Sequence, residues 1–320
     1  CSKGDFSGLT VINQLIDRDK NIFAQSKTDI LKAIPEDESL YRKKNIPALD
    51  GYNLAVACDS LVVKSPNLWD TEKPYIYTLK TQLVDINGTI IEESAQNCGF
   101  KFAVFDKDDG FFLNGRHLKI NGACHHHDHG AFGSAFNVEA LRRQFVKLQE
   151  MGINSIRCSH NPPPKAWMNL ADEMGSLIDD ECFDMWEKTK TPFDYGNYFN
   201  EWHEKDTISW VRKDRNHPSL IMWSIGNEIY DTHVGNGFEI TKRLSKIVEH
   251  FDPKKNGLIT IASNYMMTVL KIAPRKSTLS VIIILSGSTM NTTKSTVGRS
   301  MAQRHPQQFK VEESIIFLKI

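Results

Sequence analysis

A nearly continuous apolar run that ends in an amide and a carboxylate constrains the fold of this chain more than any other stretch. The run follows Pro218 and stops at Gly226, Asn227 and Glu228. Such a run is typical of a parallel strand covered on both faces, and barrels of such strands carry catalytic side chains at the strand carboxyl ends. We therefore expect Glu228 to be a catalytic carboxylate. The alternative is a solvated glutamate after a core strand.

A repeated rhythm of helix, glycine and strand surrounds this run. Asn137 is expected to cap one helix, and Gly152 to end it. The repetition indicates either a parallel barrel or a doubly wound sheet. The expected helices cover residues 138–151, 164–174, 200–212 and 239–251, and the expected strands cover residues 153–158, 176–180, 219–228 and 258–263.

The first part of the chain has a different pattern. Segments 52–57, 75–83 and 89–91 alternate apolar and polar residues, and Asp85 to Gly88 reads as a hairpin turn. This favours an all-β, immunoglobulin-like sandwich over residues 41–106. Trp69 is expected to be a packing residue there. Residues 1–40 are less regular and are expected to be a remnant or irregular segment.

Six ordered motifs connect the chain to a known family. They are PNLWD at 66–70, FLNG at 112–115, HHDHG at 126–130, RCSHNP at 157–162, DE at 180–181 and RNHP at 215–218. Together with Asn227-Glu228 they resemble glycoside hydrolase family two, the family of β-galactosidases and β-glucuronidases. The resemblance runs from about residue 66 to residue 264.

The resemblance implies a sandwich followed by an α/β TIM barrel, and a retaining exo-β-glycosidase that hydrolyses terminal β-linked sugars, β-galactosides by default. Two glutamates act in such enzymes: one protonates the leaving oxygen and the other attacks the anomeric carbon. Glu228 matches the acid/base. Asn227 matches the residue that binds the sugar 2-hydroxyl, and the alternative is a turn-forming asparagine.

Five further residues are expected at the sugar site, and the same resemblance assigns the first three of them. His126 lines the pocket, Arg157 supports the nucleophile electrostatically, and His160 contacts the sugar. The alternative for the last two is a salt-bridging arginine and a buried histidine. The Asn-Pro-Pro-Pro sequence after His160 turns the chain away from helix, which is expected to expose Arg157 and His160 at the barrel mouth. Glu181 is expected at the mouth as well. Trp186 is expected to offer an apolar face to the pyranose ring.

No metal or other cofactor is expected. The histidine-rich run 124–129 suggests zinc, but structural zinc sites take ligands from two separated segments and no second segment matches. Some galactosidases of the family hold magnesium through a Glu and a His soon after the position of Glu181. This chain has Asp184-Met185-Trp186 in that segment.

The composition of the chain limits the kinds of partner that it is expected to bind. Lys plus Arg and Asp plus Glu both number 39, so no global field favours nucleic acid or an anionic membrane. No apolar run approaches the roughly 20 residues that span a bilayer. A carbohydrate is the expected partner, and family members are often homo-oligomers. The chain starts at Cys1 without a readable signal peptide, so we expect a fragment, and periplasmic, secreted and cytoplasmic locations all stay open.

The end of the chain departs from the family. The βα rhythm stops near residue 267, so we expect barrel strands one to five within 107–267 and a non-family tail over 268–320 that lacks strands six to eight. No glutamate after Glu228 stands in a G-S-E-T context, so the nucleophile is absent as written. The alternative function is therefore a truncated, inactive fragment that at most binds carbohydrate.

A change of reading frame would explain this tail. The hexapeptide from Met301 to Pro306 can be encoded as ATG GCG CAG AGA CAC CCG. With one preceding C, the shifted frame reads H-G-A-E-T-P, which places a Glu-Thr pair where the nucleophile belongs. We therefore expect a frame change near Met267 or Thr268.

Overall fold

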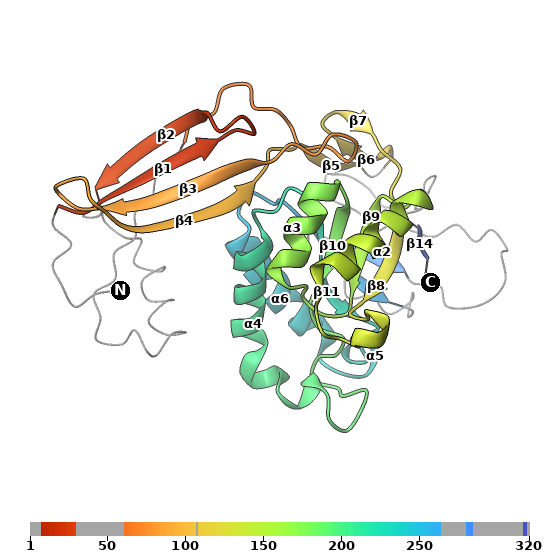
Figure 1. The fold of residues 1–320 in the computed structure, drawn as a ribbon. Helices are drawn as coiled ribbons and strands as arrows, with labels where there is room; N and C mark the ends of the chain where they lie inside the picture. Colours follow the sequence, from red (N-terminus) through yellow and green to blue (C-terminus); the bar gives the residue numbers. More distant parts are fainter. Residues whose placement is uncertain (1–7, 30–60, 107, 264–279, 284–315, 319–320) are drawn as a thin grey trace. The chain divides into compact units, whose positions relative to one another are not determined.

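The structure is a computed structural model that describes residues 8–29, 61–106, 108–263, 280–283 and 316–318 (Figure 1). The chain divides into two compact units. The first comprises residues 1–67 and 75–100, and the second comprises residues 68–74 and 101–320. The predicted strand at 52–57 lies outside the described residues.

The described residues of the first unit form a four-stranded antiparallel sheet with the order β2-β1-β3-β4. Its turn between β3 and β4 is the predicted hairpin, because the Asp85 carboxylate accepts hydrogen bonds from the backbone N–H groups of Asn87 (2.9 Å) and Thr89 (2.7 Å). The strands are β1 (Thr10–Ile16), β2 (Ile22–Asp29), β3 (Tyr77–Val84) and β4 (Ile90–Cys98).

The prediction of an irregular segment over residues 1–40 is wrong for β1 and β2. The strand β1 pairs with β2 on one side and with β3 on the other, from Thr10 opposite Val84 to Ile16 opposite Thr78. The partner strand lies more than 60 residues further along the chain, so local periodicity gave no sign of the pairing. The sheet therefore begins well before residue 41.

The second unit is built on a seven-stranded sheet with the order β13-β12-β11-β10-β9-β8-β14, in which every pair is parallel. From β8 to β13, neighbours in the sheet are also successive parallel strands in the chain, as in a β/α barrel. A small antiparallel sheet of β5 (Ala103–Asp106), β6 (Gly110–Leu113) and β7 (Arg116–His117) precedes it. The central strands are β8 (Asn121–His126), β9 (Ser155–Ser159), β10 (Leu177–Glu181), β11 (Leu220–Asn227) and β12 (Leu258–Ser263).

Helices alternate with these strands and confirm the predicted βα rhythm (Figure 1). The Asn137 side chain accepts the backbone N–H of Ala140 at 2.9 Å, which is the predicted cap of α2. None of the helices in the described ranges is both long and apolar enough to cross a membrane. The helices are α2 (Val138–Glu150), α3 (Lys165–Met174), α4 (Phe199–Asp214), α5 (Asp231–Val234) and α6 (Gly237–Phe251), with short 3-10 turns at Gly130–Phe132 and Tyr195–Asn197.

The prediction that strands six to eight are absent is wrong in part. β13 (Ser280–Ile283) pairs in parallel with β12, and β14 (Ile316–Leu318) pairs in parallel with β8. An open edge of a parallel sheet presents unpaired N–H and C=O groups, and a short extended segment satisfies them. The rest of the tail lies outside the described residues.

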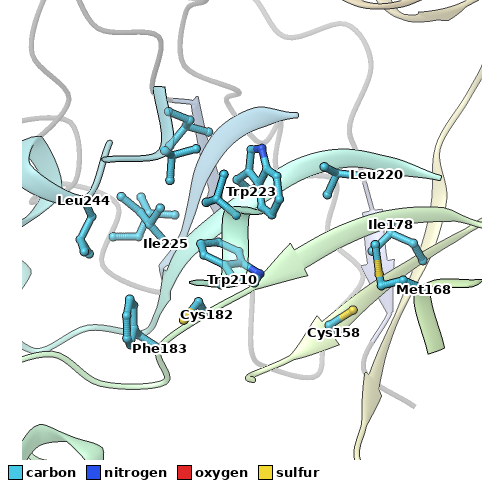
Figure 2. Packing of buried hydrophobic residues seen from close by; sticks show 14 of the residues in the cluster. Cys158, Met168, Ile178, Cys182, Phe183, Trp210, Leu220, Trp223, Ile225 and Leu244 are labelled. Carbon is cyan, nitrogen blue, oxygen red and sulfur yellow. The ribbon is translucent and has the colours of Figure 1, made fainter. Parts of the chain in front are cut away.

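The core of the second unit lies between the parallel sheet and its helices. All eight residues of β11 are buried, as expected of a strand covered on both faces. Figure 2 shows Trp223 of β11 against Trp210 of α4, with ring centroids 4.8 Å apart in an edge-to-face arrangement. Leu244 of α6 and Met168 of α3 belong to the same cluster.

Buried polar contacts fix the start of β11. The Asp172 carboxylate contacts Nδ1 of His217 at 2.5 Å and accepts the backbone N–H of Ser219 at 3.0 Å. The indole Nε1 of Trp69 donates to the Asp172 carbonyl at 2.8 Å, which confirms Trp69 as a packing residue. With its start anchored in this way, β11 has a defined register, and that register places the residues at its carboxyl end.

Candidate active site

A buried ion pair joins β9 and β10 on the side where the strands end. The guanidinium of Arg157 donates to the Glu181 carboxylate, and the two side chains are 1% and 0% exposed. Burial opposes the charge on each. Their mutual attraction, with Asp179 beside Arg157 and with His160 and Ser224 beside Glu181, outweighs it, so the pKa of Arg157 is raised and the pKa of Glu181 is lowered. Both groups are therefore charged at neutral pH.

Glu181 is the centre of a wider hydrogen-bond network. Its Oε2 accepts the hydroxyl of Ser224 at 2.5 Å, and its Oε1 lies 2.6 Å from Nδ1 of His160. An ionised carboxylate can only accept, so His160 carries a proton on Nδ1. The His126 ring stands perpendicular to the His160 ring at a centroid distance of 5.2 Å. The predicted residues His126, His160, Arg157 and Glu181 are thus brought together.

Asn227 joins the same network from the end of β11. Its Oδ1 accepts from the Arg157 guanidinium at 2.9 Å, and its Nδ2 donates to Asp184 Oδ1 at 2.8 Å. The side chain of Asn227 is almost fully buried. The amide therefore lies between a cation and an anion.

Glu228 follows directly and leaves the strand in an unusual conformation. Its φ angle is 47°, in the left-handed region that non-glycine residues rarely adopt, while its backbone N–H donates to the Ala262 carbonyl of β12 at 2.8 Å. Glu228 is partly exposed. Strained backbone of this kind is concentrated at functional sites, which makes Glu228 a candidate for one. Its position after Asn227 places its backbone at the edge of the Arg157 network.

Sequence reasoning missed several residues of this network. Asp179 is fully buried, with its carboxylate 3.7 Å from Nε of Arg157, and burial raises its pKa to about 8 even though Arg157 lowers it. Alternation along β10 could have revealed it, because Asp179 and Glu181 are two residues apart and share a face. No local signal pointed to Asp184 or to Lys190, whose Nζ lies 2.7 Å from Asp184 Oδ1.

Two predicted positions differ from the structure. Arg157 is buried rather than exposed at the mouth, because it is enclosed by the carboxylates and the amide that it binds. Trp186 is also fully buried, and its Nε1 donates to the Ile225 carbonyl at 2.9 Å. It packs with Phe199 in the core and is not a platform for a sugar ring.

The histidine-rich run continues from β8 into the following turn. Nε2 of His125 lies 3.1 Å from Oε1 of Gln144. Burial lowers the pKa of His127, and the neighbouring His129 and His126 lower it further, so this imidazole is neutral at neutral pH. Within the described ranges, no group of three or more His, Cys, Asp or Glu side chains is arranged to hold a metal ion.

Two family models match the chain. The model described as "Glycosyl hydrolases family 2, TIM barrel domain" matches residues 104–317, and the model described as "Glycosyl hydrolases family 2" matches residues 7–101. The first alone covers more than half of the chain. The antiparallel sheet of the first unit and the parallel sheet of the second correspond to the sandwich and the partial TIM barrel of this family.

Similarity to curated relatives and to solved structures agrees with these family matches. The chain is 49% identical over 176 residues to the β-galactosidase BoGH2A of Bacteroides ovatus, covering 55% of this chain and 21% of the relative. It is 43% identical over 171 residues to a putative β-glucuronidase of Formosa agariphila, covering 53% of this chain and 16% of the relative. The chain thus spans about a fifth of the length of these relatives.

Among solved structures, a β-glycosidase from Bacteroides vulgatus superimposes with a TM-score of 0.67 at 32% identity, covering 82% of this chain and 30% of the other. A glycosyl hydrolase family 2 member from Bacteroides cellulosilyticus gives a TM-score of 0.66 at 30% identity, covering 80% and 30% of the two chains. The fold, the ordered motifs and the domain matches lead to one conclusion. The chain belongs to glycosyl hydrolase family 2.

Proposed function

We propose that this chain carries the acid/base half of the active site of a retaining exo-β-glycosidase that acts on terminal β-galactosides. One observation carries the proposal. Glu228 directly follows Asn227, whose amide is bound by Arg157 in a network formed at the carboxyl ends of β9, β10 and β11. Catalytic residues of β/α barrels stand at this end of the strands.

Each residue has a distinct part in this reading. Glu228 gives a proton to the glycosidic oxygen as the bond to the anomeric carbon breaks. Asn227 presents its fixed amide to the sugar 2-hydroxyl, a contact that strengthens in the transition state. His160 and His126 line the sugar site, and Arg157 supplies positive potential near the position that the nucleophile occupies in the family.

The galactoside assignment rests on the relatives. The relative with 49% identity is named a β-galactosidase, whereas the one with 43% identity is named a putative β-glucuronidase. By name, the first acts on β-galactosides and the second is a putative enzyme for β-glucuronides. A β-glucuronide is therefore the necessary comparison substrate.

A second candidate function is sugar binding without turnover. After Glu228, the printed sequence contains no glutamate in a G-S-E-T context, and the Glu312-Glu313 pair stands between Lys310-Val311 and Ser314 instead. A retaining glycosidase needs a second carboxylate about 5 to 5.5 Å from the first. Hydrolysis through a covalent intermediate therefore has no assigned nucleophile within this sequence.

An added nucleophile separates these two functions. Azide can attack the anomeric carbon while the bond from that carbon to the aglycone oxygen breaks and Glu228 protonates that oxygen. The product is an α-galactosyl azide. We expect the chain to form it from phenyl β-galactoside in the presence of azide, and Glu228→Gln to lower that rate by about 10²- to 10⁴-fold.

The control is a substrate that needs no acid. 2,4-Dinitrophenyl β-galactoside has a leaving group that departs unprotonated, so Glu228→Gln should leave its rate with azide almost unchanged. Equal losses on both substrates would remove the acid role from Glu228. Galactose binding without any azide product would support the second function, and product from a β-glucuronide alone would overturn the galactoside assignment.

A further inference from the structure

The carboxamide of Asn227 is held at both of its ends. On one side Oδ1 accepts from the buried guanidinium of Arg157 at 2.9 Å, and on the other Nδ2 donates to Oδ1 of Asp184 at 2.8 Å. Asp184 lies after β10 and Asn227 ends β11, so the contact joins two segments that are 43 residues apart.

These contacts define which way the amide faces. Rotation by half a turn would put the Nδ2 hydrogens against the guanidinium, which can only donate, and Oδ1 against the carboxylate, which can only accept. Both contacts with Asp184 and Arg157 involve an ionised group, so each is stronger than a neutral hydrogen bond. The flipped amide would lose both at once.

Lys190 completes the arrangement. Its Nζ lies 2.7 Å from Asp184 Oδ1 and 2.9 Å from the Asn227 carbonyl oxygen. Lys190 therefore links Asp184 to the backbone of Asn227, in addition to the direct hydrogen bond between Asp184 and the Asn227 side chain. Burial raises the pKa of Asp184, but the hydrogen bonds from Lys190 and Asn227 outweigh this and hold that pKa below its ordinary value. The Asp184 carboxylate is therefore ionised at neutral pH.

We infer that Asp184, held by Lys190, is the positioning residue that sets the orientation of the Asn227 amide and thereby its selectivity for a hydroxyl at the sugar 2-position. With both contacts made, the amide keeps one N–H on Nδ2 and one lone pair on Oδ1. A hydroxyl can both accept and donate, so it fits this remaining pair. The ligand part of the inference rests on the proposed function; the amide orientation does not.

The first measurement uses no sugar. The 320-residue chain is labelled with ¹⁵N at asparagine, and the Asn227 side-chain signal is identified by its loss in Asn227→Asp. In Asp184→Leu, which replaces both acceptor oxygens by methyl groups on a side chain with the same branching at Cγ, we expect the Nδ2 hydrogens to exchange with water about tenfold faster. Asp184→Asn keeps an acceptor oxygen and should restore most of the protection. Unchanged exchange in Asp184→Leu would overturn the inference.

The second measurement tests the selectivity of the chain for a sugar that carries a 2-hydroxyl. Dissociation constants are compared for methyl β-galactoside and its 2-deoxy analogue. The unmodified chain should prefer the 2-hydroxyl by roughly three- to tenfold, about the value of one hydrogen bond. Asp184→Leu should reduce the ratio towards one, and Asp184→Asn should retain most of it. A merely structural role would weaken both sugars equally and leave the ratio unchanged, which would overturn the selectivity claim.

Glu187→Leu is the matched control. It removes a carboxylate from the same segment, but Glu187 lies 4.0 Å from Arg243 instead of contacting Asn227. The exchange rate and the sugar ratio should both stay at the unmodified values, and a Glu187 effect as large as that of Asp184 would contradict the inference. If no sugar binds while Asp184→Leu still speeds exchange, the positioning role stands and the proposed function fails.

Discussion

Ser224 and Asn227 lie three residues apart on β11, yet both contact the Arg157–Glu181 ion pair. Side chains an odd number of residues apart on a regular strand point to opposite faces. The register with β12 shifts between them, since Ser224 is opposite Thr260 and Asn227 is opposite Ala262. Between these two pairs β11 advances by three residues and β12 by two, so β11 carries one extra residue. This extra residue places the Asn227 side chain on the same face as Ser224. The irregularity thus assembles the network.

Removing the charge of Glu181 should destabilise the fold. Glu181→Gln leaves the buried Arg157 guanidinium without its principal counterion, and breaking a buried ion pair costs about 3 to 5 kcal/mol. Urea unfolding followed by circular dichroism measures the loss. Glu150→Gln, in the exposed Lys147–Glu150 pair, should change the midpoint very little. Equal effects of the two substitutions would contradict the importance of the buried pair.

Asp179 should make stability depend on pH. Its pKa is raised from 3.8 to about 8, so between these values the folded protein holds a proton that the unfolded chain releases. The contribution of the protonated Asp179 to the free energy of unfolding is therefore fully present below the ordinary pKa. It is lost as pH rises to about 8, at about 1.4 kcal/mol per pH unit. In Asp179→Asn this slope should disappear. Unfolding at pH 5, 6, 7 and 8 tests it, and parallel curves for both proteins would refute it.

The left-handed backbone conformation of Glu228 should lower the stability of the folded chain. Glycine adopts positive φ without the steric cost that alanine has there. Glu228→Gly should therefore be more stable than Glu228→Ala by about 1 kcal/mol, while both lack acid catalysis. Thermal unfolding of the two variants measures the difference. An alanine variant as stable as the glycine variant would show that the φ of 47° carries no strain.

Substitution of Trp186 should lower the stability of the fold and leave the affinity for sugar unchanged. Trp186→Phe loses the hydrogen bond to the Ile225 carbonyl and leaves space beside Gly226, where an added Cβ would lie 3.2 Å from the indole. We expect a loss of about 1 to 3 kcal/mol. Calorimetric titration with methyl β-galactoside should give an unchanged affinity in the folded variant. A large loss of affinity at unchanged stability would restore the sugar-platform interpretation.

The frame change near Thr268 stays a prediction, because most of the tail lies outside the described residues. The coding DNA decides it. One or two bases gained or lost near codon 268, with codons compatible with Glu-Thr in the shifted frame, would support it. A continuous frame whose codons cannot encode Glu-Thr would end it.

The sequence alone determined the elements that depend on short-range patterns. The apolar run of β11, the Asn137 cap and the Asp85 hairpin turn were predictable, because each rests on residues within one turn or strand. The ordered motifs placed Arg157, His160, Glu181 and Asn227 at one site, since parallel strands of a barrel bring their carboxyl ends together.

Only the tertiary structure decided the features that depend on distant partners. β1 pairs with a strand far along the chain, Trp186 is enclosed by side chains from other elements, and Asp184 meets Asn227 across 43 residues. The shift of register in β11 belongs to the same class, because it exists only relative to β12. Local periodicity fixes which way a side chain points along its own strand. Which charge or ring it then meets depends on the packing of the whole domain.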